Sequence, residues 1–502
     1  MSKKTAFGYP GLEVLLFIII LGVGVIVRAW TIGYAAPWID EIHSLLYARN
    51  PVAHLIDITR TTDIHPPLYF LSVKAWGALF GESREAARML SLVLGVTCIG
   101  LVFVIARRLF DAPTAFVAMA FFATFPTAVH YAREIRMYPL LTTLFLLSFV
   151  CFLKLYQSGS AQGGRVLRPL AALGFALCLA LAFYTHYTAA ILFMLYTLAG
   201  LWSLIRGNRT CFLWTFSGLA LATIIVTPQM VHLFSSSLGD PDKSWMEATT
   251  WSNFYSISMG AYPYDKVLKL FIFAFLMAGF FLVWRRDRST AGLIFFFTGG
   301  GMLLAAGIGV YEPMYLVRTI QIYTVFASLL VALVVMTLPR SVAVIVGLGL
   351  IGANLYTVVQ NEYLAMRETL TAEQIGPLVS LLDPKQDRVF AKAYLHGQMT
   401  LLHVPLFDIA SELTHEAFET SLAEIEAQAA CVGPDIATPC RSVVIVIEKE
   451  SRFNVQAIAA WNDMADDLKQ RYPSHSEHLL SGYRTLVLSS DPAFLAQIDE
   501  VL

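Results

Sequence analysis

The densest group of titratable side chains follows the first apolar stretch, in the segment 36–70. Two adjacent carboxylates, Asp40 and Glu41, open this segment, and Asp63 and His65 stand just before a Pro-Pro pair. Only 14% of the residues are charged, so ionisable groups gathered beside an apolar span indicate contact with something polar. A carboxylate in this position can act as a general base that takes a proton from a hydroxyl nucleophile.

Three further polar clusters stand between apolar stretches: HYAREIRMYP at 130–139, YTHY at 184–187 and YEPMYLVRT at 311–319. The candidate site residues in them are Arg133, Glu134, Arg136, Tyr138, His186, Tyr315 and Arg318. The forked guanidinium group is the best protein partner for a departing phosphate. A base together with a cationic phosphate site suits glycosyl transfer from a polyprenyl-phosphate sugar, in which an acceptor hydroxyl attacks the anomeric carbon and a lipid phosphate leaves.

Each of these assignments has an alternative. Either Asp40 or Glu41 instead holds a neighbouring arginine or a helix N-terminus. Glu134 either contacts the acceptor or pairs with the arginines beside it, and Arg136 or Arg318 is alternatively a cation at the membrane interface. A divalent cation between Asp40, Glu134 and a histidine is a further alternative, although no HExxH, CxxC or Gly-rich phosphate loop is present.

The elements that must position these residues are membrane-spanning helices. Hydrophobic residues make up 57% of the chain, which predicts a polytopic α-helical membrane protein. A span needs about 20 mainly apolar residues. Eleven such stretches are expected, near residues 11–30, 88–106, 113–131, 138–156, 169–185, 188–205, 211–228, 266–284, 291–310, 319–337 and 341–359.

Basic residues fall in alternate loops between these stretches. They are Lys3 and Lys4, Arg107 and Arg108, Lys154, Arg165 and Arg168, Arg206 and Arg209, Arg285, Arg286 and Arg288, and Arg340. The positive-inside rule makes these loops cytoplasmic. All four polar clusters and the C-terminal region are then expected together on the outer face.

Two outer loops have a predicted role near the site. The first loop, 31–87, contains the apolar segment 66–80, which is short and carries Lys74. We interpret it as an interfacial helix, because counting it as a span would place the later arginine clusters outside. The loop 229–265 is long and contains Gly, Pro and Ser beside two tryptophans, which predicts a flexible flap.

Residues 361–502 form a separate acidic domain, with 21 of the 36 acidic and 10 of the 35 basic residues. Strands expected at 388–393, 442–448 and 484–489 and helices at 416–430 and 455–470 predict a small extracytoplasmic α/β domain. Cys431 and Cys440 are expected to form a disulfide there, whereas the other four cysteines lie in or beside apolar spans. Basic residues are scattered, so nucleic acid is not an expected partner.

The DE pair after the first span, the HPPLYF motif at 65–70 and the R-E-x-R-M-Y turn at 133–138 also carry a resemblance. They resemble the GT-C superfamily of polyprenyl-phosphate-sugar-dependent glycosyltransferases. The particular likeness is to the bacterial PMT/ArnT-like enzymes of families 39 and 83, which are related to protein mannosyltransferases and to the lipid A aminoarabinose transferase. The likeness covers residues 10–360 in layout and is specific over 36–140.

The resemblance implies a GT-C bundle and a metal-independent, inverting transfer that needs no cofactor. It implies that Asp40 is the base, and that the HPP segment and the 133–138 turn lie beside the donor phosphate. Glu41 and Glu134 join Asp40 as catalytic candidates. The expected donor-binding residues are His65, Arg133, Arg136, Tyr138, His186, Tyr315 and Arg318. The aminoarabinose transferase has lysine where this chain has His65.

The sequence therefore predicts a multi-pass glycosyltransferase of the bacterial inner membrane, with its site on the periplasmic side. It is expected to move a monosaccharide from a polyprenyl-phosphate donor to a cell-envelope glycan or lipid, such as lipopolysaccharide. A lipid-glycan flippase or transporter is one alternative, although no internal repeat or broken pair of spans supports it. An O-antigen ligase or polymerase is another, but such enzymes lack the DE and HPPLYF pattern.

Overall fold

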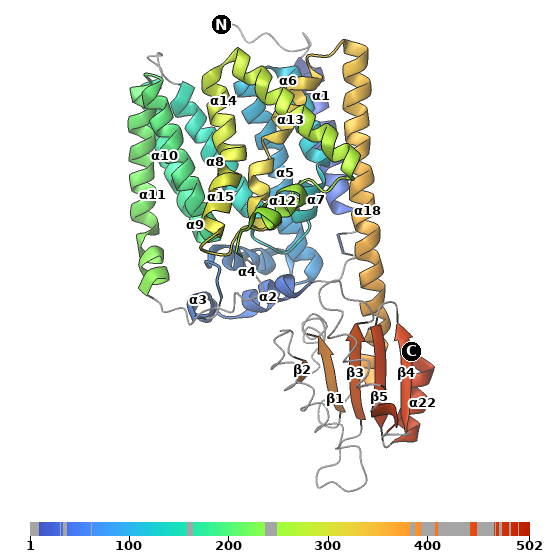
Figure 1. Cartoon of the computed structure of the whole chain (residues 1–502). Coiled ribbons are helices and arrows are strands. Elements are labelled where there is room, and N and C mark those ends of the chain that lie inside the picture. The colour runs from blue at the N-terminus through green and yellow to red at the C-terminus, as the bar shows by residue number, and fades with distance from the viewer. Residues whose placement is uncertain are drawn as a thin grey trace. The chain divides into compact units, whose positions relative to one another are not determined.

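A computed structural model gives the fold of the chain (Figure 1). It describes residues 10–30, 32–33, 38–61, 63–157, 164–235, 248–381, 387–392, 407–409, 442–448, 466, 468–470, 474–480, 483–489 and 491–501. The chain divides into two units. The first comprises the described residues of 1–32 and 44–360, and the second those of 33–43 and 361–502.

The first unit is a bundle of apolar helices, and short helices follow the first of them in the chain. Figure 1 shows α3 (Val52–Thr61) and α4 (Leu68–Phe80) at one end of this bundle. The other helices are α1 (Pro10–Ala29), α5 (Arg84–Leu109), α6 (Ala112–Thr124), α7 (Pro126–Tyr131), α8 (Tyr138–Gln157), α9 (Gly164–Thr185), η1 (Tyr187–Ala189), α10 (Ala190–Ile205), α11 (Arg209–Ser235), α12 (Trp251–Gly260), α13 (Lys266–Arg286), α14 (Arg288–Phe295), η2 (Phe296–Gly300), α15 (Gly301–Gly309), α16 (Val317–Ile320), η3 (Gln321–Thr324) and α17 (Ala327–Val335).

Within the described residues, ten helical segments are long and apolar enough to cross a membrane. They correspond to ten of the eleven expected spans. The remaining expected span, 113–131, is divided into α6 and α7, because Pro126 cannot donate the backbone hydrogen bond that would continue α6. The 13-residue α4 is shorter than the roughly 20 residues that a span needs.

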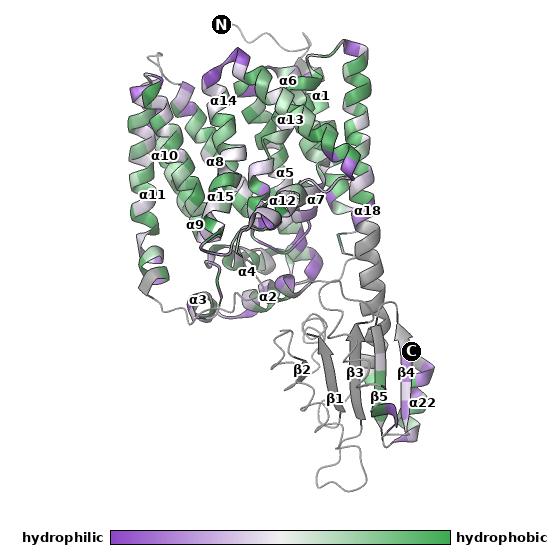
Figure 2. Cartoon of the chain, viewed as in Figure 1, coloured by the Kyte–Doolittle hydropathy of each residue, from purple (hydrophilic) through white to green (hydrophobic). Residues whose placement is uncertain are grey.

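The middle parts of the helices are more hydrophobic than their ends (Figure 2). The helices are apolar along most of their length, with many large hydrophobic side chains exposed on α1, α11 and α13. Exposed apolar side chains on long helices are what a lipid environment favours. Asp111 and Asp287 accept backbone hydrogen bonds at the starts of α6 and α14, where they satisfy otherwise unpaired N–H groups.

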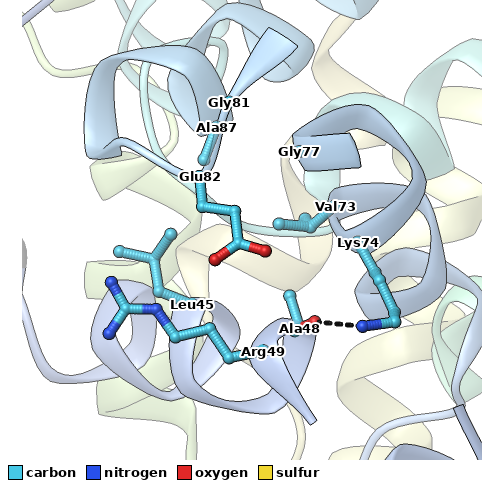
Figure 3. Close-up of a pocket in the computed structure, with 9 residues that line it drawn as sticks. All are labelled: Leu45, Ala48, Arg49, Val73, Lys74, Gly77, Gly81, Glu82 and Ala87. Carbon is cyan, nitrogen blue, oxygen red and sulfur yellow. Dashed lines mark hydrogen bonds between the residues drawn. The ribbon is translucent and has the colours of Figure 1, made fainter. Parts of the chain in front are cut away.

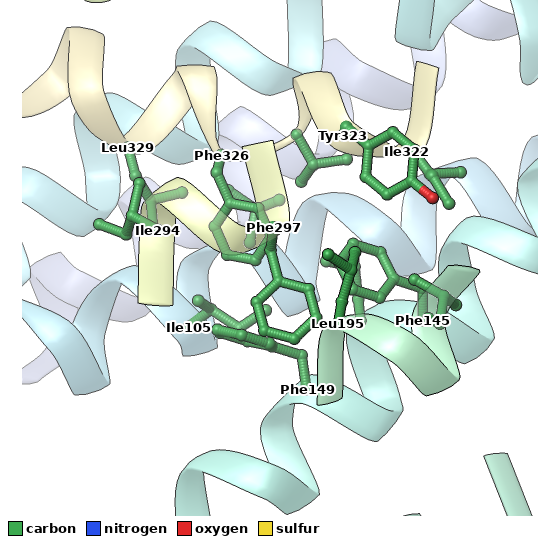
Figure 4. Close-up of a cluster of buried hydrophobic side chains, with 14 of the residues drawn as sticks. Ile105, Phe145, Phe149, Leu195, Ile294, Phe297, Ile322, Tyr323, Phe326 and Leu329 are labelled. Atoms are coloured by element: carbon green, nitrogen blue, oxygen red, sulfur yellow. The ribbon is translucent and has the colours of Figure 1, made fainter. Parts of the chain in front are cut away.

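An aromatic core joins the middle of the bundle (Figure 4). The Phe149 ring on α8 lies 5.1 Å from that of Phe297 and 4.8 Å from that of Phe326, both in edge-on geometry. The Tyr196 ring on α10 lies 4.8 Å from Phe297, and its hydroxyl is 2.7 Å from that of Ser148. Such pairs add to the burial energy of the rings, so this core holds α8, α10 and the later helices in fixed positions.

The second unit contains a mixed five-stranded sheet of order β2-β1-β3-β5-β4. Its strands are β1 (Asp387–Lys392), β2 (Phe407–Ile409), β3 (Ser442–Glu448), β4 (His475–Leu480) and β5 (Tyr483–Ser489). Strand β1 pairs in parallel with β2 and β3, and β5 pairs antiparallel with β3 and β4. Phe494 and Ile498 of α22 (Pro492–Val501) are buried beside this sheet.

The three strands expected from the sequence are present as β3, β5 and, shifted by one residue, β1. Two strands were not predicted. β2 has only three residues, and β4 (HSEHLL) is too polar to show an apolar pattern. The last helix leading to this unit, α18 (Arg340–Leu381), continues 22 residues beyond the expected span end at 359. The expected helix 416–430, most of 455–470, and Cys431 and Cys440 lie outside the described residues.

Candidate active site

The turn between α7 and α8 carries the centre of the candidate site. Arg133 and Arg136 lie in this turn and are 8% and 3% exposed, and Tyr138 at the start of α8 is 1% exposed. Arg133 Nη2 donates to the backbone carbonyl of Trp30 at 2.6 Å, just beyond the end of α1. Arg133 therefore holds the end of α1 in place, and the phosphate contact expected from the sequence stays a prediction.

Arg136 faces the segment that precedes α4. Its Nη2 lies 3.5 Å from Nε2 of His65 and its Nη1 lies 3.5 Å from the hydroxyl of Ser44. Asp63 Oδ1 accepts from both the backbone N–H and the ring Nδ1 of His65, each at 2.7 Å. The structure thus brings two predicted residues together, and the HPP segment meets the 133–138 turn as expected.

Asp63 is ionised in this arrangement. Burial opposes the charge on its carboxylate, but the hydrogen bonds and charge of His65, with a contribution from Arg136, lower the pKa of Asp63 below its usual value. A carboxylate fixed on Nδ1 of an imidazole sets the ring orientation and leaves Nε2 for the other side. Asp63 therefore directs His65 Nε2 toward Arg136.

His186 lies beside His65, with ring centroids 5.2 Å apart. Its Nδ1 accepts from the backbone N–H of Thr188 at 3.2 Å, so this nitrogen carries no proton and Nε2 is the donor of a neutral ring. Burial is the largest cause that lowers the pKa of His186 well below its usual value, and the electrostatic influence of His65, Arg136 and Arg318 lowers it further. His186 is consequently a neutral hydrogen-bond donor in a cationic site.

Arg318 reaches the same region from α16. Its charge acts on His186 and also on Tyr131 at the end of α7. Burial and then the charge of Glu134 raise the pKa of Tyr131 well above its usual value, while Arg318 opposes that rise. The rings of Tyr131 and Tyr138 are 5.2 Å apart. Residues from four separate segments therefore converge, as the sequence predicts.

Two predicted residues have other partners. Glu134 Oε1 lies 3.2 Å from Nε2 of His130, so its ion pair is with that histidine rather than with an adjacent arginine. Tyr315 is 2% exposed. Its hydroxyl is 2.8 Å from that of Ser258, and its ring stacks on that of Phe254 with the centroids 5.5 Å apart. Tyr315 therefore packs the segment before α16 against α12.

Asp40 and Glu41 lie in the first turn of α2 (Ile39–Arg49), within the second unit. Glu41 Oε2 accepts from the backbone N–H of Trp38 at 3.3 Å. This is the reciprocal half of a capping box, in which a glutamate at the third helical position satisfies the N-terminal backbone. Glu41 is 1% exposed and Asp40 is half-buried, so the two carboxylates differ in their surroundings.

A separate pocket lies between α2, α4 and α5 (Figure 3). Arg49, Lys74 and Glu82 supply its charged groups, and Lys74 Nζ donates to the backbone carbonyl of Ala48 at 3.2 Å. None of the residues predicted for the site lines this pocket. Among the residues that the structure describes, no group of three or more His, Cys, Asp or Glu is placed to hold a metal, and metal independence stays a prediction.

Comparisons with known proteins agree with this arrangement. Residues 64–232, which include His65, Arg136 and His186, match the sequence model of the family described as dolichyl-phosphate-mannose-protein mannosyltransferase. No curated protein sequence matches the chain.

Solved structures show the same fold. ArnT from Cupriavidus metallidurans in the apo state matches with a TM-score of 0.59 and 14% identity, over 96% of this chain and 98% of that one. The same protein bound to undecaprenyl phosphate gives 0.57 with the same identity and coverage. The Archaeoglobus fulgidus oligosaccharyltransferase in complex with Zn and sulfate matches with 0.56 and 14%, over 93% and 72% of the two chains.

Residues 64–232 are therefore similar to this mannosyltransferase family, and the chain has the fold of ArnT and of the archaeal oligosaccharyltransferase. The candidate site includes residues that were not predicted. Asp63, Thr188 and Ser44 were not among the candidates, although the Asp-x-His spacing of 63–65 is a signal for the first of them. Thr188 and Ser44 act through contacts between segments that are distant in sequence or through a local turn, and a sequence pattern does not reveal such contacts.

Proposed function

We propose that this protein is a glycosyltransferase that moves a monosaccharide from a polyprenyl-phosphate donor to a cell-envelope glycan or lipid on the outer face of the bacterial cytoplasmic membrane. The observation that carries the proposal is the buried cluster at the end of the bundle, in which Arg136 lies against His65 and Asp63 fixes the His65 ring. The nearby Arg318 adds a second guanidinium to the cluster.

The donor class follows from the charge of this cluster. Asp63 supplies one negative charge, Arg136 and Arg318 supply positive charge, and His186 is neutral, so the cluster attracts an anion. It lies at the end of an apolar helical bundle, where a phosphate with a lipid tail meets both a polar and an apolar surface. ArnT from Cupriavidus metallidurans, which shares the fold, has been solved with undecaprenyl phosphate.

The reaction requires one proton acceptor and one stabilised leaving group. The acceptor oxygen forms a bond to the anomeric carbon as the bond from that carbon to the phosphate oxygen breaks, and the hydroxyl proton goes to the base. The lipid phosphate gains negative charge as the sugar leaves. Arg136, Arg318 and the Nε2–H of His186 are donors that stabilise this developing charge.

Asp40 is the base in this proposal. Its neighbour Glu41 accepts the Trp38 N–H in the capping box of α2, and the resemblance of the DE pair to the PMT/ArnT-like enzymes points to Asp40 as the base. The periplasmic location rests on the basic loops, which the positive-inside rule assigns to the cytoplasm.

The test is the release of free polyprenyl phosphate by the purified protein in vesicles, using a donor labelled in both sugar and lipid. We expect release with an acceptor extract present, and the same rate with EDTA. A transporter moves the labelled donor across the bilayer without releasing lipid phosphate. An O-antigen ligase or polymerase releases lipid diphosphate from a diphosphate-linked donor and ignores the monophosphate. Either result contradicts the proposal.

A further inference from the structure

Arg28 is fully buried in α1, within one of the apolar segments that can span a membrane. Its Nη1 donates to the backbone carbonyl of Ala123 at 2.6 Å and to that of Gly24 at 3.2 Å. The bond to Ala123 ties α1 to the last turn of α6, where helix carbonyls lack partners within their own helix, and the bond to Gly24 stays within α1. They use one of the three guanidinium nitrogens.

The other two nitrogens of Arg28, Nε and Nη2, are buried and have no hydrogen-bond partner in the described part of the chain. They form one edge of the guanidinium group, and their N–H bonds point in parallel. This is the edge with which arginine binds an anion through two hydrogen bonds. A buried N–H group without a partner costs free energy, and more so when it is charged.

A small cavity of about 20 Å³ adjoins this guanidinium. Its lining includes Gly95, Cys98, Tyr131, Thr142 and Gln321. A Cβ at Gly95 would stand 3.2 Å from Arg28 Nε and 2.5 Å from Ala132 Cβ, so the glycine keeps the space beside Nε open. The volume accommodates one water molecule or one ion of similar size.

The charge of Arg28 distinguishes these two occupants. Arginine stays protonated in proteins, and a buried charge is costly unless a counter-charge is present. None of the described residues lining the cavity is a carboxylate, and the groups that act electrostatically on Arg28 are the buried side chain of Cys98 and the cationic Arg133. A water molecule would satisfy the N–H groups but not the charge.

We propose that this cavity binds one small monovalent anion of the size of chloride, held by Nε and Nη2 of Arg28. Gln321 completes the site from η3, where its Nε2 donates to Thr142 Oγ1 at 3.0 Å and retains a second N–H. The anion links α1, α5 and η3 behind Tyr131, whose ring contacts Tyr138 of the active site. It therefore supports the wall of the active site and takes no part in the transfer.

The first experiment measures the melting temperature of the purified full-length protein in potassium gluconate and in potassium chloride at equal ionic strength. We expect chloride to raise it by about 5 °C in a saturable way, as for a ligand well above its dissociation constant. Sulfate, which exceeds the cavity, should give no rise. Equal melting temperatures in chloride and gluconate would overturn the proposal.

The variant Gln321→Glu places a carboxylate in the cavity and should remove the dependence on chloride. The matched control is Gln229→Glu, an equally buried glutamine whose Nε2 donates to the Tyr187 hydroxyl, and it should keep the dependence. If Gln321→Glu keeps it too, chloride acts elsewhere and the site is refuted. A crystal grown in bromide tests the site without any variant. An anomalous peak beside Arg28 Nε and Nη2 would support the anion site, and a water molecule there without anomalous signal would contradict it.

Discussion

A single carboxylate oxygen of Asp63 accepts hydrogen bonds from both the ring Nδ1–H and the backbone N–H of His65, each at 2.7 Å. The bond to the backbone N–H closes a local turn at the start of the HPP segment. The bond to the ring fixes the orientation of the imidazole. Asp63 therefore sets both the backbone conformation and the direction of the His65 ring. The far nitrogen of that ring then faces Arg136. This arrangement gives the cationic cluster a defined geometry before any donor binds.

Asp63→Asn should lower transfer by about tenfold or more, because a neutral amide holds the His65 ring less firmly. The effect should appear mainly in the donor KM, measured by release of lipid phosphate at varied donor concentration. Asp57→Asn is the matched control, since Asp57 is an exposed aspartate on α3, and it should behave as wild type. Equal loss in both variants would show that Asp63 does not act through His65.

Stability should depend on pH through His186. Because its pKa in the folded protein is held well below about 6.5, its value in the unfolded chain, the unfolded state binds a proton that the folded state does not. Stability is therefore lost as the pH falls below about 6.5. His186→Asn should flatten the melting temperature between pH 5 and 7, roughly the window of this titration. The exposed His54 is the control, and His54→Asn should leave the slope unchanged.

Tyr315→Phe should destabilise the protein by about 1 kcal/mol, the usual worth of one hydrogen bond, with little change in the donor KM. The reason is that the Tyr315 hydroxyl bonds Ser258 of α12. Ser258→Ala should have the same effect, and the double variant should be no worse than either single one. A large rise in donor KM for Tyr315→Phe alone would instead support the donor contact expected from the sequence.

Arg318→Ala should raise the donor KM by about tenfold or more, as expected for the loss of a charged hydrogen bond. Arg318→Lys keeps the charge and should lose less, although lysine lacks the forked geometry. Kinetics with the labelled donor measure both variants. If they are impaired equally, Arg318 does not contact the phosphate.

Much of this architecture follows from the sequence because apolar length fixes spanning helices. The ten spans, and the fact that α4 is too short to be one, can be predicted from the lengths of the hydrophobic runs. The break at Pro126 was missed because 113–131 is apolar throughout and hydropathy does not register a lost backbone hydrogen bond. β4 was missed because its polar sequence is held by pairing with β5 rather than by an apolar pattern.

The sequence predicted which residues belong to the candidate site better than it predicted what each of them contacts. His65, Arg136, His186 and Arg318 come together because successive helices return their polar ends to one side of the bundle. The roles of Arg133, Glu134 and Tyr315 depend on particular partners, namely the Trp30 carbonyl, His130 and Ser258. Those partners lie on other elements or on the same short turn. The type of a residue alone does not show whether it contacts such a partner or the donor phosphate.

The most direct test compares Asp40→Asn with Glu41→Gln in the release of free polyprenyl phosphate from a labelled donor. Glutamine at 41 still accepts the Trp38 N–H of the capping box, so Glu41→Gln should stay within about tenfold of wild type. Asp40→Asn should fold normally and lose a factor of about 100 or more, the contribution of a general base. Near-normal release by Asp40→Asn, or equal loss in the two variants, would contradict the assignment of Asp40 as the base.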